Sequence, residues 1–367
     1  MNQINLNRLR RLLLLFCSVL LGTSMITGCT TPEDTSQEDQ VLDLSVTTSL
    51  EAGEQYFNSL LPYHTNETRG LLASRIGRVD GNHLELGMLD IAQQTFDREK
   101  VYFQEGNMLK REQVVRWLER NSAENPEGLN PAKNPKVEKQ EPLFLLHLLE
   151  HDYVQRDGTL AGMVIGLSIA PPAKVKDAQE RAHLLQQQLE KGKGIAQEVT
   201  LRIRNQGIDV PIIIALYYTQ PAQSFLPGNF VAVGKVKAKE EKISEWEDLG
   251  EEYLIFPSGE LATKYEDLQD QFNTISDNAQ DFFPNYVSLV GTGRFVNKQL
   301  VELTVEANAS FESKTEVIQL TQYLGEQLKD TLPKSVHINL YVSSVNKPQA
   351  LYVRPIEGKD YMHIYRN

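Results

Sequence analysis

The sequence is poor in cysteine. Only Cys17 and Cys29 occur among 367 residues, and both lie near the N-terminus. The rest of the chain therefore has no free thiol and cannot form a disulfide bond. An exported chain of this length can do without such bonds, because it is long enough to bury a large apolar core.

An apolar run long enough to cross a bilayer is also missing at the N-terminus. The segment "LLLLFCSVLL" (Leu12–Leu21) has about half of the roughly 20 apolar residues that a membrane-spanning helix needs. It follows three basic residues, Arg8, Arg10 and Arg11, and is soon interrupted by polar residues such as Thr23. A basic stretch followed by a short apolar stretch is typical of a secretory signal. A short anchor that remains attached is the alternative.

The chain has fewer basic than acidic residues. The chain has 37 basic and 49 acidic residues, for a net charge of −12, and loss of the signal with its three arginines would lower this to −15. Such a body should not bind nucleic acid or anionic wall polymers through a general positive field. A specific basic pocket remains open as a route to an anionic partner.

Catalytic motifs are scarce. The stretch "HLLEH" (His147–His151) matches the H-x-x-E-H pattern of inverted zinc peptidases. On a helix, two histidines four residues apart share a face and leave a zinc position open to water. Because so short a pattern often matches by chance, we expect a surface helix carrying two histidines, with no metal, no cofactor and no catalytic residue. An extracytoplasmic zinc peptidase or wall hydrolase that uses His147, Glu150 and His151 is the alternative.

The end of the signal has a distinctive sequence. Ile26-Thr27-Gly28-Cys29 resembles the lipobox of bacterial lipoproteins, in which a peptidase cuts before a lipid-modified cysteine. We predict cleavage between Gly28 and Cys29 and lipidation of Cys29. Two acyl chains anchor a protein stably, so we expect the mature protein on the outer face of the cell membrane, held by lipid. Ordinary secretory cleavage near a chance cysteine is the alternative.

Composition divides the rest of the chain. Residues 29–48 are acidic and poor in apolar residues, which predicts a flexible tether. Residues 49–125 show mainly helical periodicity, as in "HLELGMLDIAQQTF". Residues 126–142 contain four prolines and many charges and predict a linker. Residues 143–367 form the remaining domain.

This last region alternates strand and helix patterns. The order strand, helix, strand, strand occurs near 159–237 and again near 299–354. We therefore predict an α+β fold, in which a helical N-terminal region precedes largely antiparallel sheets covered by long amphipathic helices. The repeated order suggests two related modules.

One loop carries several aromatic residues. The stretch "YYTQPAQSFLPGNF" places Tyr217, Tyr218, Phe225 and Phe230 around two prolines. Exposed rings on a rigid turn make good contact residues, so this is a candidate binding loop. Rings that fold inward as part of the core are the alternative.

Several stretches together resemble one known family. They include "RGLLASRIGRVD", "LELGMLDIAQQTF", "VPIIIALYYTQPAQSFLPGNFVAVGKV", "FFPNYVSLVGTGRF" and "ALYVRP". This sequence resembles the CamS sex-pheromone lipoproteins of low-GC Gram-positive bacteria over nearly all of residues 67–365. The resemblance implies a lipid-anchored cell-surface protein, and a signal-peptide tail, here "GTSMITG", that can be trimmed to a pheromone inducing plasmid transfer. The resemblance implies no active site. We therefore expect the folded part of the mature protein to be non-enzymatic and to bind an unknown protein, peptide or wall partner.

Overall fold

The computed structural model describes residues 45–46, 56–68, 70–71, 78–171, 175, 177–221, 224–283, 286–311, 313–345 and 347–366. All of them belong to one compact unit, Leu44–Asn367. The predicted signal peptide lies outside these residues, and so do the predicted sites at Gly28 and Cys29. Among the described helices, none is both long and apolar enough to cross a membrane.

The predicted tether, 29–48, is described only at Ser45 and Val46. These two residues form β1 (Ser45–Val46), which pairs antiparallel with β2 (Leu60–Leu61). The rest of the predicted tether lies outside the described residues.

A first six-stranded sheet has the order β3-β4-β5-β6-β7-β8. Its strands are β3 (Tyr102–Glu105), β4 (Leu145–Val154), β5 (Leu160–Ile169), β6 (Ile212–Tyr218), β7 (Asn229–Val236) and β8 (Glu245–Asp248). Only β5 and β6 are parallel, because the helix α5 (Ala178–Arg204) connects them as a crossover. The other neighbours are antiparallel.

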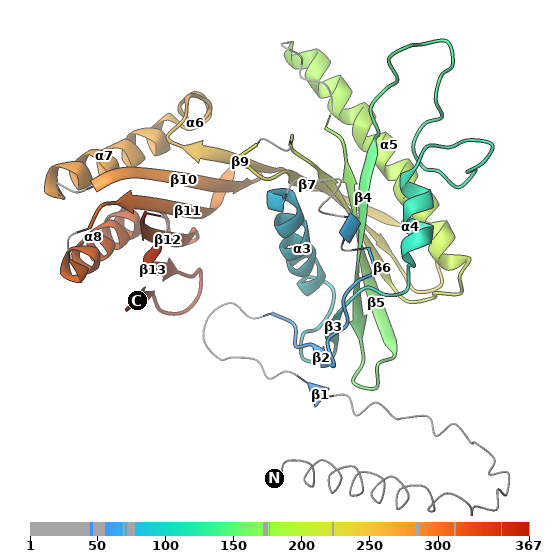
Figure 1. Ribbon diagram of the computed structural model, residues 1–367, viewed down its shortest axis with the longest axis horizontal. Helices are drawn as coiled ribbons and strands as arrows, with labels where there is room; N and C mark the ends of the chain where they lie inside the picture. Colours follow the sequence, from blue (N-terminus) through green and yellow to red (C-terminus); the bar gives the residue numbers. More distant parts are fainter. Residues whose placement is uncertain are drawn as a thin grey trace, which may run out of the picture. The chain divides into compact units, whose positions relative to one another are not determined.

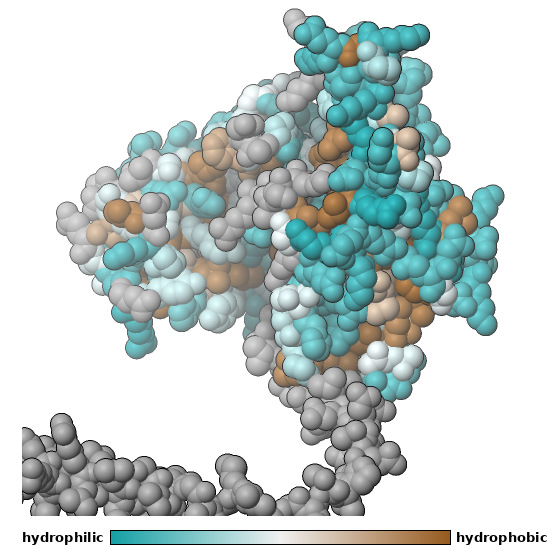
Figure 2. All heavy atoms as spheres, turned by 45° about the vertical axis from the view of Figure 1, so that its right-hand side comes forward, coloured by the Kyte–Doolittle hydropathy of each residue, from teal (hydrophilic) through white to brown (hydrophobic). Residues whose placement is uncertain are grey.

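Helices cover both faces of this sheet (Figure 1). On one face α3 (Arg78–Gln93) buries Leu84 and Met88 against β5 and β6. On the other face α4 (Arg111–Leu118) and α5 pack over a second apolar cluster. Because both faces are covered, the central strands are nearly continuous apolar runs without the alternation of a half-exposed strand. Hydrophilic side chains separate the apolar patches on the face that Figure 2 shows.

A second six-stranded sheet has the order β9-β10-β11-β12-β13-β14. Its strands are β9 (Glu251–Phe256), β10 (Tyr286–Val296), β11 (Gln299–Ala309), β12 (His337–Ser344), β13 (Lys347–Arg354) and β14 (Tyr361–Ile364). Three helices form its core cluster together with the inward residues of the strands: α6 (Gly259–Lys264), α7 (Glu266–Phe282) and α8 (Lys314–Thr331). α7 and α8 contact each other and share this one core cluster, so they lie on the same face of the sheet.

The two sheets have the same topology. Each contains three strands, a crossover helix and three more strands, with one parallel pair at the centre, β5–β6 and β11–β12. In each, further helical structure lies between the first two strands: α4 in the first sheet, α6 and α7 in the second. The predicted α+β class and the two related modules are therefore confirmed, and the likeness extends beyond the four elements that the sequence indicated.

The expected division into a helical region (49–125), a linker (126–142) and a C-terminal domain (143–367) does not match the sheets. β3 precedes the loop at 126–142, yet it pairs directly with β4, which follows that loop. Both α3 and α4 pack on the same sheet. The proline-rich segment is therefore a loop within one module, and the chain passes from one sheet to the other between β8 and β9.

Candidate functional site

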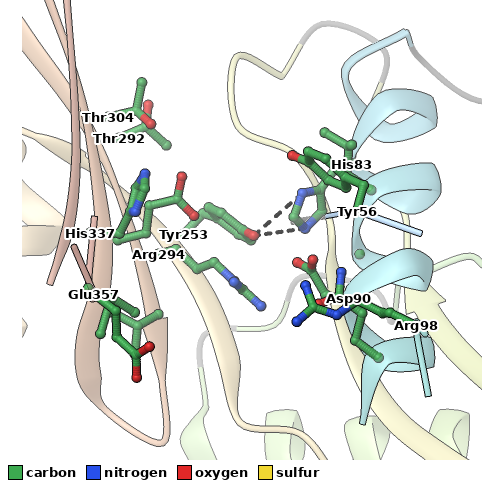
Figure 3. A pocket seen from close by; sticks show the side chains of 16 residues that line it. Tyr56, His83, Asp90, Arg98, Tyr253, Thr292, Arg294, Thr304, His337 and Glu357 are labelled. Carbon is green, nitrogen blue, oxygen red and sulfur yellow. Dashed lines mark hydrogen bonds between the residues drawn. The ribbon is translucent and has the colours of Figure 1, made fainter. Parts of the chain in front are cut away.

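A polar groove lies between α3 and the face of the second sheet that is opposite to α7 and α8 (Figure 3). Its volume is about 760 Å³. The helix contributes His83, Leu86 and Asp90, and the sheet contributes Tyr253, Thr292, Arg294, Glu302, Thr304 and His337. These residues define what we call the polar groove.

The helical side of the polar groove follows from the period of α3. Positions 83, 86 and 90 are three and four residues apart, so His83, Leu86 and Asp90 share one face of the helix. Leu84 and Met88 lie on another face and are completely buried against the first sheet. Core packing of α3 therefore turns the first set of side chains into the groove.

The sheet side follows from strand alternation. In β11, Leu303 and Val305 point into the core, so the neighbouring Glu302 and Thr304 point the other way. Register brings the polar positions together, because Thr292 pairs with Thr304 and Arg294 with Glu302. The strands thus present a row of polar side chains to the groove, with Val301 of β11 beside them.

A buried carboxylate organises the floor of the polar groove. Glu251 is only 7% exposed. Its Oε2 accepts a hydrogen bond from the backbone N–H of Phe230 at 2.7 Å, and its Oε1 accepts one from Nε of Arg294 at 2.7 Å. The hydroxyl of Tyr253 lies 3.2 Å from Oε1 and 2.8 Å from Nε2 of His83. This network joins α3, β7, β9 and β10.

The charges in this network support one another. Burial opposes ionisation of Glu251, but hydrogen bonding to His83 and attraction to Arg294 hold the pKa of its carboxyl below the ordinary value. Burial likewise opposes the charge on Arg294, yet the neighbouring Glu251 raises the pKa of the guanidinium. Burial and the charge of Glu251 raise the pKa of Tyr253, so its hydroxyl stays protonated. The floor is therefore a fixed ion pair with a neutral phenol.

Arg294 keeps part of its hydrogen-bonding capacity for the groove. Its Nε is bound to Glu251, whereas Nη1 and Nη2 have no hydrogen-bond partner among the described residues. Figure 3 shows the side chain extending from the sheet toward α3. A guanidinium fork held in this way can bind a planar anion with two parallel hydrogen bonds.

The "HLLEH" stretch does not form the expected helix. It lies in β4, where His147, Glu150 and His151 are all buried. Side chains alternate between the two faces of a strand, so Glu150 points away from His147 and His151. The helix prediction is wrong because this segment pairs with β5 along its whole length and with β3 at His151. Among the described residues, no group of three or more metal-ligating side chains could hold an ion.

Glu150 instead holds a loop in place. Its two carboxyl oxygens accept hydrogen bonds from the backbone N–H groups of Met108 and Leu109, each at 3.0 Å. Asp152, two residues further along the same face of β4, accepts one from Asn107 at 3.1 Å. Burial raises the pKa of both carboxyls, and the charge of Glu150 raises that of Asp152 further. The two acids therefore form a buried pair whose negative charges repel each other.

The predicted aromatic binding loop is mostly core. Tyr217, Tyr218 and Phe230 are buried, with exposed fractions of 0%, 6% and 2%, whereas Phe225 is 90% exposed. Tyr217 lies in β6 and packs edge-on against Phe230 of β7, at 5.0 Å between ring centres. The prediction of an exposed contact surface is wrong for these three rings, because they belong to strands covered on both faces. Phe225 alone projects into solvent.

The residues of the polar groove gave no local signal in the sequence. His83, Glu251 and Arg294 are separated by more than forty residues at each step and match no motif. The one available indication was the alternation of polar and apolar residues in β10 and β11. That alternation shows which strand face is polar, but not what faces it.

Comparison with known proteins places the chain in a family. A sequence model of the family described as "CamS sex pheromone cAM373 precursor" matches residues 63–360. The chain belongs to this family. The match includes every residue of the polar groove as defined above, and the N-terminal segment with Cys29 lies outside the matched range.

Solved structures agree with the CamS assignment. A crystal structure of a sex pheromone precursor from Lactobacillus salivarius subsp. salivarius UCC118 is similar, with 25% identity and a TM-score of 0.77, over 88% of this chain and 99% of that one. The C-terminal domain of the sex pheromone staph-cAM373 precursor from Staphylococcus aureus is similar with 25% identity and a TM-score of 0.66, over 79% of this chain and 97% of that domain. A search of curated protein sequences found no match.

Proposed function

We propose that this CamS family member is a non-enzymatic lipoprotein, anchored on the outer face of the cell membrane through acyl chains on Cys29. The proposal rests on the order of three features in the N-terminal segment. Three arginines come first, a short apolar stretch follows, and Ile26-Thr27-Gly28-Cys29 ends the segment. Membership of a sex pheromone precursor family supports the proposal, because a precursor is cut to release its product.

Acylation is tested by intact mass analysis and by growing cells with a labelled palmitate analogue. We expect label on the wild-type protein and on Cys17→Ser, which changes a cysteine inside the signal, and none on Cys29→Ser. An unacylated mature N-terminus at another position would contradict the anchor.

The cleaved signal peptide is proposed as the source of a second product. Its tail, "GTSMITG" (Gly22–Gly28), would be trimmed to a short peptide that responding cells sense and answer with plasmid transfer. Synthetic "GTSMITG" at nanomolar concentration should induce transfer in responder cells, and a peptide of the same composition in scrambled order should not. Equal responses to both peptides, or to neither, would remove this part of the proposal.

For the folded body we propose a binding role at the polar groove. The support comes from the ionisation and pairing of its polar groups. Glu251 is paired with Arg294, and the raised pKa of Tyr253 keeps its hydroxyl protonated. Neither the Glu251 carboxylate nor the Tyr253 hydroxyl is therefore prepared to act as a base or a nucleophile. Fixed donors and acceptors beside a cavity suit recognition of a ligand. Filling the groove with Thr304→Trp should abolish ligand binding without unfolding the protein. Stoichiometric zinc in the purified protein, with hydrolytic activity lost in Glu150→Gln, would contradict the non-enzymatic role.

A further inference from the structure

We propose that the polar groove binds a short peptide by its free C-terminal carboxylate, with Arg294 as the anchoring residue. The inference rests on the binding role proposed for the groove and specifies its ligand. It concerns the folded body alone, so it does not depend on acylation of Cys29.

Arg294 is oriented before any ligand arrives. Its Nε is held at 2.7 Å by Glu251, and Glu251 is itself fixed by the backbone N–H of Phe230. The side chain of Glu251 is 3% exposed, and that of Arg294 is 29% exposed. One edge of the guanidinium is therefore buried and bound while the other reaches the groove. Binding to such a fork needs little further ordering of the protein, which favours affinity.

The surroundings favour a carboxylate over a phosphate group. Arg294 pairs across the sheet with Glu302, and Asp90, Arg98 and Glu357 also line the pocket, so that three acids face it against two arginines. The whole chain carries a net charge of −12. A dianionic phosphate or an anionic polymer would be repelled by these acids, whereas a single planar carboxylate matches both the charge and the geometry of one fork.

The rest of the groove suits a peptide rather than a small acid. The cavity of about 760 Å³ is far larger than a carboxylate and falls within the usual range for ligand pockets. The paired hydroxyls of Thr292 and Thr304 can donate to and accept from peptide groups. Leu86 and Ile356, which are 51% and 61% exposed, offer apolar contacts at the rim. The acids that disfavour phosphate would attract a peptide's ammonium group.

The test compares two sets of tripeptides, Ala-Ala-X with free carboxylates and the same set with C-terminal amides. Binding to the full-length chain in detergent is followed by saturation-transfer NMR and then by calorimetric titration of the strongest binder. We expect the amide to bind at least about tenfold more weakly, because it cannot form the charged bidentate contact. Acetate and inorganic phosphate, added as competitors, should displace the peptide only at much higher concentration.

Two variants test the anchor without leaving a buried charge unpaired. Arg294→Lys keeps the charge but loses the fork, and the double variant Glu251→Gln, Arg294→Gln removes both charges together. The double variant should lose the preference for the free carboxylate, and Arg294→Lys should weaken it, because an ammonium group attracts a carboxylate without the bidentate contact. The matched control is Arg116→Gln, because Arg116 also binds a carboxylate through Nε, that of Glu127 at 3.1 Å, but lies on α4 away from the groove. This control should bind like the wild type.

The outcomes separate the inference from the function on which it rests. If free and amidated peptides bind equally and Thr304→Trp abolishes both, the groove binds peptides but the carboxylate anchor is wrong. If phosphate competes as well as the free peptide, the ligand class is wrong. If no peptide binds, or if binding survives Thr304→Trp, both the inference and the proposed binding role are overturned.

Discussion

The buried carboxyl pair of β4 should make the stability of the protein depend on pH. Glu150 and Asp152 are each about 1% exposed. Burial raises the pKa of Asp152 well above its ordinary value of 3.8, and the charge of Glu150 raises it further. Two ionised carboxylates repel each other and cannot share a hydrogen bond, because each can only accept. One proton kept by the pair removes one negative charge and supplies a donor. The native protein therefore holds a proton that the unfolded chain releases near pH 4.

The sign of the effect follows from this difference. Because the native pKa is raised, the contribution to stability is complete below about pH 4 and is lost as the pH rises toward the native pKa. Where the native pair still holds its proton, the free energy of unfolding falls by about 1.4 kcal/mol per pH unit for each proton. Asp152→Asn replaces the protonated carboxyl by a neutral amide of nearly the same shape, and its oxygen can still accept from Asn107.

Urea unfolding of the wild type and of Asp152→Asn from pH 5.5 to 8.5 tests this reasoning. The difference in unfolding free energy should move in favour of the variant by about 1.4 kcal/mol for each pH unit over which the native pair still holds its proton, and should level off once the pair has lost it. The control is Asp157→Asn, because Asp157 is exposed in the turn between β4 and β5 and hydrogen bonds from Thr159 lower the pKa of its carboxyl. Its contribution is lost only as the pH falls below that range, so its difference from wild type should stay flat. A constant difference for Asp152→Asn as well would refute the shared proton.

Denaturant unfolding should also report three other perturbations. In Gly87→Ala the new Cβ would lie 2.1 Å from the buried ring of Phe230, which should cost about 1–3 kcal/mol, whereas Gly194→Ala on α5 meets nothing within 4 Å and should stabilise by about 0.5–1 kcal/mol; equal effects at both glycines would contradict the packing of α3. Asp80→Asn removes one acceptor oxygen from a side chain that accepts three hydrogen bonds and should cost about 1–3 kcal/mol, so a neutral result would contradict that role. Glu251→Gln leaves its paired arginine partly buried without a counter-charge and should cost about 2–3 kcal/mol, and an unchanged stability would contradict the ion pair.

Periodicity predicted much of the secondary structure. The apolar stripe of α3 and the strand-helix-strand-strand order were both readable, because buried faces impose a period of 3.6 on helices and 2 on strands. The "HLLEH" stretch failed for the same physical reason. A strand covered on both faces has no alternation, so its leucines and histidines were equally compatible with a helix.

The aromatic loop illustrates a different difficulty. Tyr217 and Tyr218 lie a few residues before Pro221 and resemble turn residues, but they are the last residues of β6. Each faces one of the two apolar clusters that lie on opposite sides of the first sheet. Whether a ring near a turn is exposed depends on the layers above and below it, which the local sequence does not specify.

The sequence by itself determined most of the secondary-structure elements and the repeated order of two modules, since each is encoded by neighbouring residues. Only the tertiary structure decided the pairing of β3 with β4, the boundary between the sheets and the polar groove. Glu251, Arg294 and His83 are far apart along the chain and meet because core packing places α3 opposite one face of β9 and β10. Contacts between such distant residues depend on how the elements pack against one another, and the hydrophobic periodicity of a single element does not predict them.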